Sequence, residues 1–474
     1  MGFKEDATLA VEALAGYLAR TSAGEGPVLR QPPLAELAER LELRALIAGG
    51  GLHGARLAAW LERYLEATTR LHHPGYYAHQ VAAPEPAGAI GSLVDGLCNN
   101  PGAIYEMGPA AATIEFVVVN WLLGQVGWTA PPLPPAAPTP GCAGGVLTHG
   151  GSLANLTALL AARARIDPAG WMEGSRRDLV VLAPEAAHYS ISRAVGIMGL
   201  GQQALVAAPV DAEGRLVPDR LPQALAAQQD RGRTVLAVVA NACSTAAGLY
   251  DPLREAARCC RERGVWLHVD GAHGASALVS PRLRHLLDGV DQADSLVWDA
   301  HKMLRTPALC AAVLVREARH LDGAFRQDAS YLFHAKDEPG FDFMPRSVEC
   351  TKAGLGLRLF MVLAAQGEGA LAAHVERQTA LAVAAAERLG REPGLEVAVR
   401  PESSIVCFRV AGSDERQLEV RRRLLAGERH YLSSAVFRGR RWLRLALMSP
   451  ATDEAELERL IAAVHAAAAA TAVG

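Results

Sequence analysis

Two apolar runs in the middle of the chain each end at charged residues. The first run, residues 265–269, ends on Asp270, and the second, residues 295–298, leads into Lys302. Apolar runs this short predict buried strands. In open α/β sheets, ligands bind at the carboxyl ends of the strands. The sequence therefore predicts that Asp270 and Lys302 lie together at a ligand site.

An aspartate and a lysine at such a site suit pyridoxal phosphate. A lysine amine condenses with an aldehyde to give a Schiff base, and a neighbouring carboxylate favours the protonated form of a pyridine nitrogen. The protonated ring then accepts electrons from a bond that breaks at the substrate. The chain has lysines only at positions 4, 302, 336 and 352, and Lys302 alone directly follows an apolar run. Either residue by itself would be read as half of a structural ion pair, but the two together favour the cofactor.

The composition is that of a globular protein with a large core, long enough for about two or three domains. Of the 474 residues, 50% are hydrophobic, and 47 basic against 50 acidic residues give a formal net charge of −3. No basic stripe points to nucleic acid or a membrane surface, and no uncharged apolar run is long enough for a membrane span. The eight cysteines form no CxxC pair with metal-site spacing. We therefore expect a reducing, cytoplasmic location and no metal.

Other segments of the same kind carry groups that suit a cofactor. Residues 144–165 predict a strand, a glycine turn and a helix, and the free N–H groups at the start of that helix, around Gly151 and Ser152, suit a phosphate. His188 and Ser244 each follow a further apolar run. An imidazole at such a place can stack on a pyridine ring, and a hydroxyl can bond the ring or its phosphate. Each feature alone is more often a helix start or an ordinary loop residue.

The remaining patterns predict an α/β protein with a smaller α/β domain at its C-terminus. Helices are expected at residues 5–20, 34–48, 57–69, 88–97, 109–126, 355–365, 371–389, 414–426 and 453–470. Strands are expected at residues 178–182, 234–240, 265–269, 295–298, 308–315, 404–410 and 441–448. Residues 327–340 predict a long irregular segment, which in a compact enzyme is often a lid.

With these motifs in place, the sequence resembles the group II pyridoxal-phosphate-dependent amino acid decarboxylases over roughly residues 74–450. The most specific motifs are residues 268–274 and 298–303. The resemblance implies an aspartate-aminotransferase-like fold (fold type I), with a mainly parallel seven-stranded sheet in the large domain and a small C-terminal α/β domain. It also implies a homodimer with shared active sites. The implied segments are a helical region that packs on the partner subunit, the large cofactor-binding domain and the small domain, at residues 1–85, 86–365 and 366–474.

The resemblance also implies roles for individual residues. Lys302 would form the internal aldimine, Asp270 would pair with the pyridinium nitrogen, and His188 would stack on the ring. Tyr331 is similar to a tyrosine of a mobile loop that reaches the partner's site and protonates the substrate carbon. Arg444 resembles an arginine that contacts a substrate carboxylate.

Two further sets of contacts follow from the resemblance or from neighbouring sequence. The remaining cofactor contacts are expected from Gly151, Ser152, Ser244, Ala272, Asp299 and His301. The expected substrate contacts are Tyr77, His79, Gln80, Asn100 and Ile104, the last two from the partner chain. His79 lies in a stretch with two other histidines, for which a metal site is a weaker interpretation than a substrate pocket or a simple loop.

The implied reaction is the decarboxylation of an L-amino acid to its amine and carbon dioxide through a quinonoid intermediate. The main alternative is oxidative decarboxylation and deamination by an aldehyde synthase on the same scaffold, and the presence of Tyr331 favours the simple reaction. Another fold type I reaction and a catalytically inactive interaction protein are weaker alternatives. Acidic, aromatic and diaminobutyrate-like substrates all remain open, although His79 and Gln80 suit a polar side chain better.

The chain departs from the family pattern at four positions. His149 stands where relatives often carry a small residue. Asp299 stands where many have asparagine, and it would bring a negative charge near an anionic phosphate. Cys243 replaces a glycine, and Lys352 replaces an arginine. None of these changes removes a residue that the chemistry requires.

Overall fold

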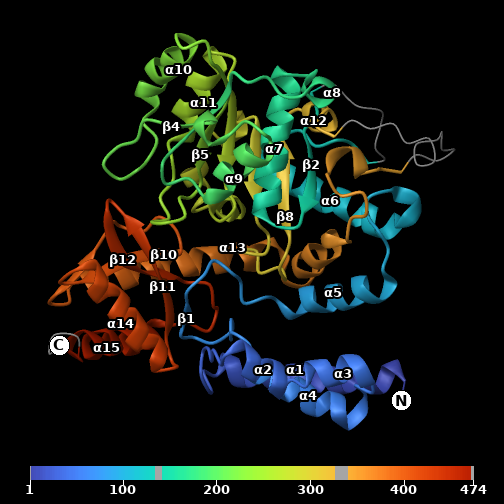
Figure 1. Ribbon diagram of the computed structural model, residues 1–474, viewed down its shortest axis with the longest axis vertical. Helices are drawn as coiled ribbons and strands as arrows, with labels where there is room; N and C mark the ends of the chain where they lie inside the picture. Colours follow the sequence, from blue (N-terminus) through green and yellow to red (C-terminus); the bar gives the residue numbers. More distant parts are fainter. Residues whose placement is uncertain (1, 134–140, 326–339, 471–474) are drawn as a thin grey trace. The chain divides into compact units, whose positions relative to one another are not determined.

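A computed structural model describes residues 2–133, 141–325 and 340–470, and it divides the chain into two compact units (Figure 1). The large unit comprises Pro84–Ala380 with Pro401–Ser404. The small unit comprises Met1–Ala83, Leu381–Arg400 and Ile405–Gly474. The N-terminal region therefore belongs to the same unit as the C-terminal part of the chain. The expected division had placed these two regions in separate segments. Its expected packing on a partner subunit stays a prediction.

The large unit is built on a seven-stranded sheet with the strand order β2-β8-β7-β6-β5-β3-β4. All neighbouring pairs are parallel except those that β8 makes with β2 and β7. This confirms the mainly parallel sheet that the sequence implied. The strands are β2 (Gly144–Thr148), β3 (Leu179–Ala183), β4 (Leu205–Ala207), β5 (Thr234–Asn241), β6 (Trp266–Asp270), β7 (Ser295–Trp298) and β8 (Ala311–Val315).

Buried apolar residues explain why these strands form and why most were predictable. Every residue of β2, β3, β6, β7 and β8 is buried, as expected for a sheet covered on both faces. The edge strand β4 was not predicted, because it is only three residues long and its short apolar run is followed closely by Pro209. The helix α7 (Gly151–Ile166) packs on five of the strands and positions its N-terminus beside the end of β2.

The helices of the large unit lie around this sheet (Figure 1). Besides α7 they are α5 (Pro86–Cys98), α6 (Pro109–Val126), α8 (Gly170–Glu173), α9 (Tyr189–Ile197), α10 (Leu221–Gln229), α11 (Leu253–Glu262), α12 (Ala318–Asp322) and most of α13 (Leu355–Gly390). The two helices predicted over residues 355–389 are confirmed as the two parts of α13, which is interrupted at Gly367 with a φ of 71°.

Within the described residues, two helices, α6 and α13, are long and apolar enough by composition to cross a membrane. The packing of α6 on β2 and β8 accounts for its apolar character, because its buried residues form part of the core of the large unit. α6 also carries the buried carboxylate of Glu115, which pairs with Lys352. A helix of this kind is typical of a protein core.

The small unit contains a five-stranded sheet with the order β1-β11-β12-β10-β9. Its strands are β1 (Tyr76–Tyr77), β9 (Leu395–Val397), β10 (Ile405–Val410), β11 (Tyr431–Phe437) and β12 (Arg440–Ala446). β1 pairs in parallel with β11 and so joins the N-terminal region to the C-terminal sheet. The helices α14 (Asp414–Ala426) and α15 (Glu454–Ala470) contribute buried residues to its core.

The N-terminal region of the small unit is helical. Its helices are α1 (Phe3–Ser22), α2 (Leu34–Arg40), α3 (Leu43–Gly49) and α4 (Gly54–Glu66). The single helix predicted over residues 34–48 is wrong, because Glu42 between α2 and α3 has a left-handed backbone with a φ of 53°. Its side chain instead bonds two arginines, Arg56 and Arg63, of α4.

Candidate active site

Asp270 is the last residue of β6, and both oxygens of its carboxylate have defined donors. Oδ1 accepts a hydrogen bond of 3.2 Å from the backbone N–H of Ala272. Oδ2 accepts one of 3.0 Å from the side-chain amide of Asn155, on α7. The carboxylate is buried and held by neutral donors, so its negative charge is available to a cation placed beside it.

Lys302 follows β7 and pairs with Asp299 at the same end of the sheet. Lys302 Nζ lies 3.0 Å from Asp299 Oδ2, and 19% of the lysine side chain is exposed. His301 Nε2 lies 3.6 Å from the same oxygen, and its Nδ1 lies 2.8 Å from the carbonyl oxygen of Cys310. Asp299 Oδ1 is buried and has no hydrogen-bond partner among the residues that the structure describes. The lysine is thus near a carboxylate that is itself only partly satisfied.

The turn between β2 and α7 brings backbone close to this pair. Gly150 has a φ of 99°, which favours glycine, and Gly151 begins the helix. A Cβ atom added to Gly151 would lie 2.8 Å from each oxygen of Asp299. The start of α7, with Ser152 as its second residue, is a cradle of backbone N–H groups that suits a phosphate, and the Asp299 carboxylate lies directly against it.

His188 caps the N-terminus of α9 and lies in the electrostatic field of the same groups. Its Nδ1 is 2.7 Å from Ser190 Oγ and also accepts the backbone N–H of Ser190 at 3.2 Å. Burial lowers the pKa of His188; the negative charge of Asp270 opposes this shift and the positive charge of Lys302 adds to it. The structure therefore brings the neutral imidazole of His188 close to Asp270 and Lys302. The sequence had singled out all three of these residues.

Ser244 and Ala272 take part in the loops that follow β5 and β6. The Oγ of Ser244 accepts the backbone N–H of Leu249 at 3.1 Å, which leaves its own hydrogen for another partner. The backbone of Ala272 donates to Asp270 and its carbonyl accepts the N–H of Asp299 at 3.1 Å. Ala272 therefore ties together the ends of the two strands that carry the reactive groups.

Sequence reasoning missed four polar residues beneath this site: Asn155, Ser190, His268 and Ser295. Each is buried and hydrogen-bonded to another of them. One signal was available, because a polar residue on an otherwise apolar buried helix such as α7 must find a partner. The partners of Asn155 are Ser190, 35 positions away, and His268, 113 positions away, and no local pattern indicates either of them.

Two of the predicted substrate residues lie in the large unit. Asn100 is exposed, and its amide donates to the carbonyl of Cys98 at 2.8 Å. Ile104 is only 4% exposed and packs with Ala103 and Met344 of its own chain. Burial in its own unit leaves the Ile104 side chain little free surface, and its predicted contact with a substrate bound to the partner stays a prediction. Tyr331 lies outside the residues that the structure describes.

The other predicted substrate residues lie in the small unit. Tyr77 is fully buried in the hydrophobic core, with its ring stacked on His430 at 6.3 Å between centroids. Its position on β1 turns the side chain into the core, and its predicted contact with substrate stays a prediction. His79 Nε2 lies 3.1 Å from Tyr431 Oη, whereas Gln80 is partly exposed.

Arg444, on β12, belongs to the same cluster as His79. Its Nη1 donates to the carbonyl oxygen of Ala78 at 3.5 Å and to Ser433 Oγ at 3.4 Å. The pKa of His79 is lowered by burial and then by the positive charges of Arg444 and Arg421. The small unit therefore holds a cationic cluster whose histidine is neutral.

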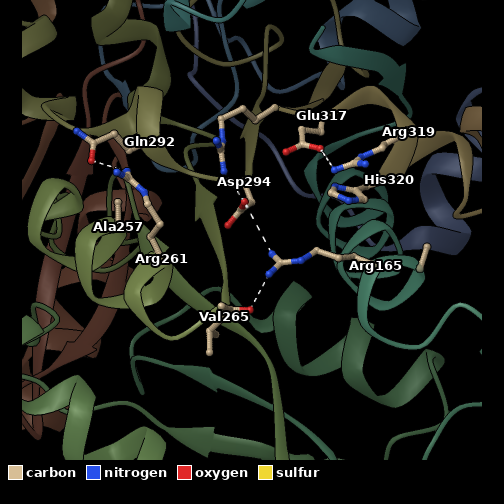
Figure 2. Close-up of a pocket in the computed structure, with 12 residues that line it drawn as sticks. Arg165, Ala257, Arg261, Val265, Gln292, Asp294, Glu317, Arg319 and His320 are labelled. Atoms are coloured by element: carbon tan, nitrogen blue, oxygen red, sulfur yellow. Dashed lines mark hydrogen bonds and ion pairs between the residues drawn. The ribbon is translucent and has the colours of Figure 1, made fainter. Parts of the chain in front are cut away.

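A hollow of about 570 Å³ lies at the opposite end of the sheet, beside the starts of β6 and β7 (Figure 2). Its arginines are already bonded: Arg316 to Asp294 at 2.8 Å, and Arg261 to Gln292 at 2.7 Å. Arg165 and Arg261 stand in the last turns of α7 and α11, where cations offset the negative ends of helix dipoles. These contacts account for the arginines that line the hollow. The hollow lies at the other end of strands β6 and β7 from Asp270 and Lys302.

Comparison with known proteins matches the chain to one family. The family model described as a pyridoxal-dependent decarboxylase conserved domain matches residues 62–411. The chain is 30% identical over 341 residues to the cysteine sulfinic acid decarboxylase of Mus musculus, covering 71% of this chain and 67% of that protein. It is 29% identical over 338 residues to an L-aspartate decarboxylase of Metarhizium robertsii, covering 70% and 66%.

Solved structures share the fold over nearly the full length. The 4-hydroxyphenylacetaldehyde synthase of Rhodiola rosea superposes with a TM-score of 0.83 at 24% identity, covering 99% of each chain. The site geometry fits the cofactor of the matched family: a lysine and an aspartate stand at the ends of neighbouring parallel strands, beside a glycine cradle for a phosphate. The chain belongs to the pyridoxal-dependent decarboxylase family and is an amino acid decarboxylase that uses pyridoxal phosphate.

Proposed function

We propose that this decarboxylase acts on an acidic L-amino acid and releases the corresponding amine and carbon dioxide. The observation that carries the reaction is the placement of Lys302, Asp270 and the Gly151 turn at one end of the large sheet. Two observations support an acidic substrate. The relatives named above act on cysteine sulfinate and aspartate by their names, and the small unit contains the cationic cluster of His79, Arg421 and Arg444.

Bound pyridoxal phosphate supplies an electron sink for the bond that breaks at the substrate's α-carbon. Lys302 would bond the cofactor's aldehyde, and the start of α7 at Gly151 and Ser152 would hold its phosphate. Asp270 would hold the proton on the ring nitrogen, because its buried negative charge favours the cationic form. His188, kept neutral by burial, would lie on the ring face without adding a competing positive charge.

The remaining residues bind the substrate and move its protons. We assign to Arg444 and His79 the binding of substrate, with the guanidinium opposite a carboxylate. Tyr331 is our proposed donor of the proton that replaces the lost carboxylate. A neutral His79 can donate one hydrogen bond to a substrate oxygen, whereas its charged form would be destabilised by the two arginines.

A panel of amino acids tests the substrate class. The purified protein with added pyridoxal phosphate is incubated with L-aspartate, L-cysteine sulfinate, L-glutamate, L-2,4-diaminobutyrate and L-tryptophan while carbon dioxide and amine are measured. We expect turnover of one or more acidic substrates. Turnover of tryptophan or diaminobutyrate alone would contradict the acidic class and leave the decarboxylase assignment intact.

The role of Lys302 is tested in the same assay. Lys302→Ala is expected to abolish the visible absorbance band of the bound cofactor and to lower turnover at least about a thousandfold. Lys4→Ala, a lysine-to-alanine change on α1, is the matched control and is expected to keep the absorbance band and the turnover. A Lys302→Ala protein with normal absorbance and turnover would place the cofactor on another amine.

The oxidative reaction is the second candidate, because an aldehyde synthase shares the whole fold with this chain. Hydrogen peroxide and ammonia, measured beside carbon dioxide, separate the two reactions. Stoichiometric peroxide would favour the aldehyde synthase, whereas amine without peroxide supports simple decarboxylation.

We also propose that the active protein is a homodimer. α5 in the large unit carries the apolar residues Ile90, Leu93, Val94 and Leu97 at helical spacing, and each is at least 45% exposed. Such a stripe is typical of a helix face covered by another surface. Leu93→Glu combined with Leu97→Glu is expected to give a monomer by light scattering. Met172→Glu, at a residue that is 84% exposed on α8, is the matched control and leaves the dimer intact. A wild-type monomer would contradict the proposal.

A further inference from the structure

A continuous chain of side-chain hydrogen bonds runs beneath the predicted cofactor site. It starts at the indole N–H of Trp266, which donates to Ser295 Oγ at 2.8 Å. Ser295 Oγ lies 2.8 Å from His268 Nδ1, and His268 Nε2 lies 2.8 Å from Asn155 Oδ1. The amide nitrogen of Asn155 then lies 3.0 Å from Asp270 Oδ2. All five side chains are buried.

The direction of these bonds follows from the chemistry of the groups. An ionised carboxylate only accepts, so the group of Asn155 that faces Asp270 must be the amide nitrogen. The amide oxygen of Asn155 then faces His268, and it also only accepts. His268 must therefore carry a hydrogen on Nε2.

The directions of the two remaining hydrogen bonds, at Ser295 and Trp266, follow from the charge state of His268. Burial lowers the pKa of His268 to about 4, against the opposing effect of Asp270, so the ring is neutral near pH 7 and carries one hydrogen. Nδ1 is then an acceptor and takes the hydroxyl hydrogen of Ser295. The Ser295 oxygen in turn accepts from Trp266, whose indole nitrogen can only donate.

A second branch leaves Asn155 toward His188. The other hydrogen of the Asn155 amide points to Ser190 Oγ, 2.8 Å away. Ser190 therefore gives its own hydrogen to His188 Nδ1, 2.7 Å away. The backbone N–H of Ser190 also donates to that nitrogen, so the single hydrogen of neutral His188 is on Nε2.

We propose that Asn155 is a positioning residue that orients Asp270 toward the cofactor's ring nitrogen and fixes His188 in its Nε2–H form. This inference rests on the proposed roles of Asp270 and His188. Asparagine suits the junction because its amide offers two donors and one acceptor in a fixed plane. An aspartate at position 155 would place a second carboxylate against Asp270, and leucine would leave Ser190, Asp270 and His268 without their shared partner.

Asn155→Leu tests the junction directly. We expect pyridoxal phosphate to bind about 10- to 100-fold more weakly in an absorbance titration, because one buried oxygen of Asp270 loses its donor. In holoenzyme loaded with ring-¹⁵N pyridoxal phosphate, the ¹⁵N chemical shift is expected to move toward that of an unprotonated pyridine. Thr157→Val is the matched control, because it removes a buried hydroxyl of α7 that is not part of the hydrogen-bonded series. It is expected to leave the cofactor affinity and the ¹⁵N chemical shift unchanged.

A pair of His268 variants separates positioning from a merely structural role. His268→Gln keeps an N–H donor for the Asn155 oxygen and is expected to bind the cofactor within about 3-fold of the wild type. His268→Leu removes that donor and is expected to weaken binding about 10-fold and to shift the ¹⁵N signal. Wild-type affinity and ¹⁵N shift in both Asn155→Leu and His268→Leu, or equal changes in Thr157→Val, would overturn the inference. A wild-type protein that binds no pyridoxal phosphate would instead overturn the proposed function.

Discussion

Lys352 and Lys302 each pair with a carboxylate in the large unit. The two pairs differ in the exposure of the lysine and in the hydrogen bonding of the carboxylate. Lys352 Nζ lies 2.5 Å from Glu115 Oε2, and both side chains are almost fully buried. The other oxygen of Glu115 accepts the backbone N–H of Leu147 at 2.9 Å. Lys302 and Asp299 are 3.0 Å apart, the lysine side chain is 19% exposed, and one oxygen of Asp299 lacks a partner among the described residues.

The comparison shows that residue types alone do not separate a structural lysine from a reactive one. In the first pair, both carboxylate oxygens have donors and water is excluded, so neither charge can change partner without a large desolvation cost. Burial raises the pKa of Glu115, and the charge of Lys352 opposes that shift. In the second pair, the lysine is accessible and its partner is not saturated. Lys302 can therefore exchange one partner for another, as a covalent role requires.

The largest expected effect comes from breaking the buried pair. Lys352→Met leaves Glu115 buried without a counter-charge, so we expect the free energy of unfolding to fall by about 3–5 kcal/mol. Combining it with Glu115→Leu removes the stranded charge and is expected to recover most of that loss. Urea unfolding followed by circular dichroism measures all variants.

The control for this prediction is Lys302→Met, at the more accessible pair. Its loss of unfolding free energy is expected to be smaller than that of Lys352→Met by about 2 kcal/mol or more, because the Lys302 side chain is already 19% exposed and His301 stays 3.6 Å from the same Asp299 oxygen. Equal losses at the two lysines would show that the difference in burial does not matter.

Acidification is expected to have an intermediate effect, through two histidines that burial keeps neutral in the folded protein. The pKa values of His268 in the large unit and His73 in the small unit are each lowered to about 4, mainly by burial. Between pH 6.5 and about 4 the unfolded chain therefore binds protons that the folded chain does not, and stability falls as pH falls. Each histidine is expected to cost about 2 kcal/mol between pH 6.5 and 5.

The variant His268→Gln attributes this effect to one residue. Its unfolding free energy is expected to fall less steeply over the same pH range, by the contribution of one proton. An unchanged slope would mean that His268 is already charged or exposed in the folded protein.

The smallest expected effect is on cofactor binding, at the pair of Lys302 and Asp299. The carboxylate of Asp299 lies against the start of α7, where the cofactor phosphate is expected, and like charges repel. Asp299→Asn is therefore expected to tighten pyridoxal phosphate binding about 5-fold, or about 1 kcal/mol, in an absorbance titration. Glu173→Gln, which removes one exposed negative charge on α8, controls for net charge. Weaker binding in Asp299→Asn would show that the carboxylate helps to hold Lys302 for the cofactor.

Much of the fold was predictable because its signals are local. The strand at residues 295–298 matches β7 in both bounds. The strand expected at 234–240 ends one residue before β5 does, and the one expected at 265–269 is shifted from β6 by one residue at each end. Buried parallel strands need an unbroken apolar run, and a run of that kind is visible in sequence. The predicted helix over residues 34–48 failed because a left-handed residue can end a helix without interrupting its apolar pattern.

The sequence by itself determined the chemistry of this protein: a lysine and an aspartate at strand ends, a glycine turn before a helix, and a family motif around them. Only the tertiary structure decided which residues support that chemistry. Asn155 and Asp270 are 115 positions apart, and Tyr77 becomes a core residue only because β1 pairs with a strand more than 350 residues later. Side chains far apart in sequence meet only through chain folding, so local patterns cannot reveal their contacts.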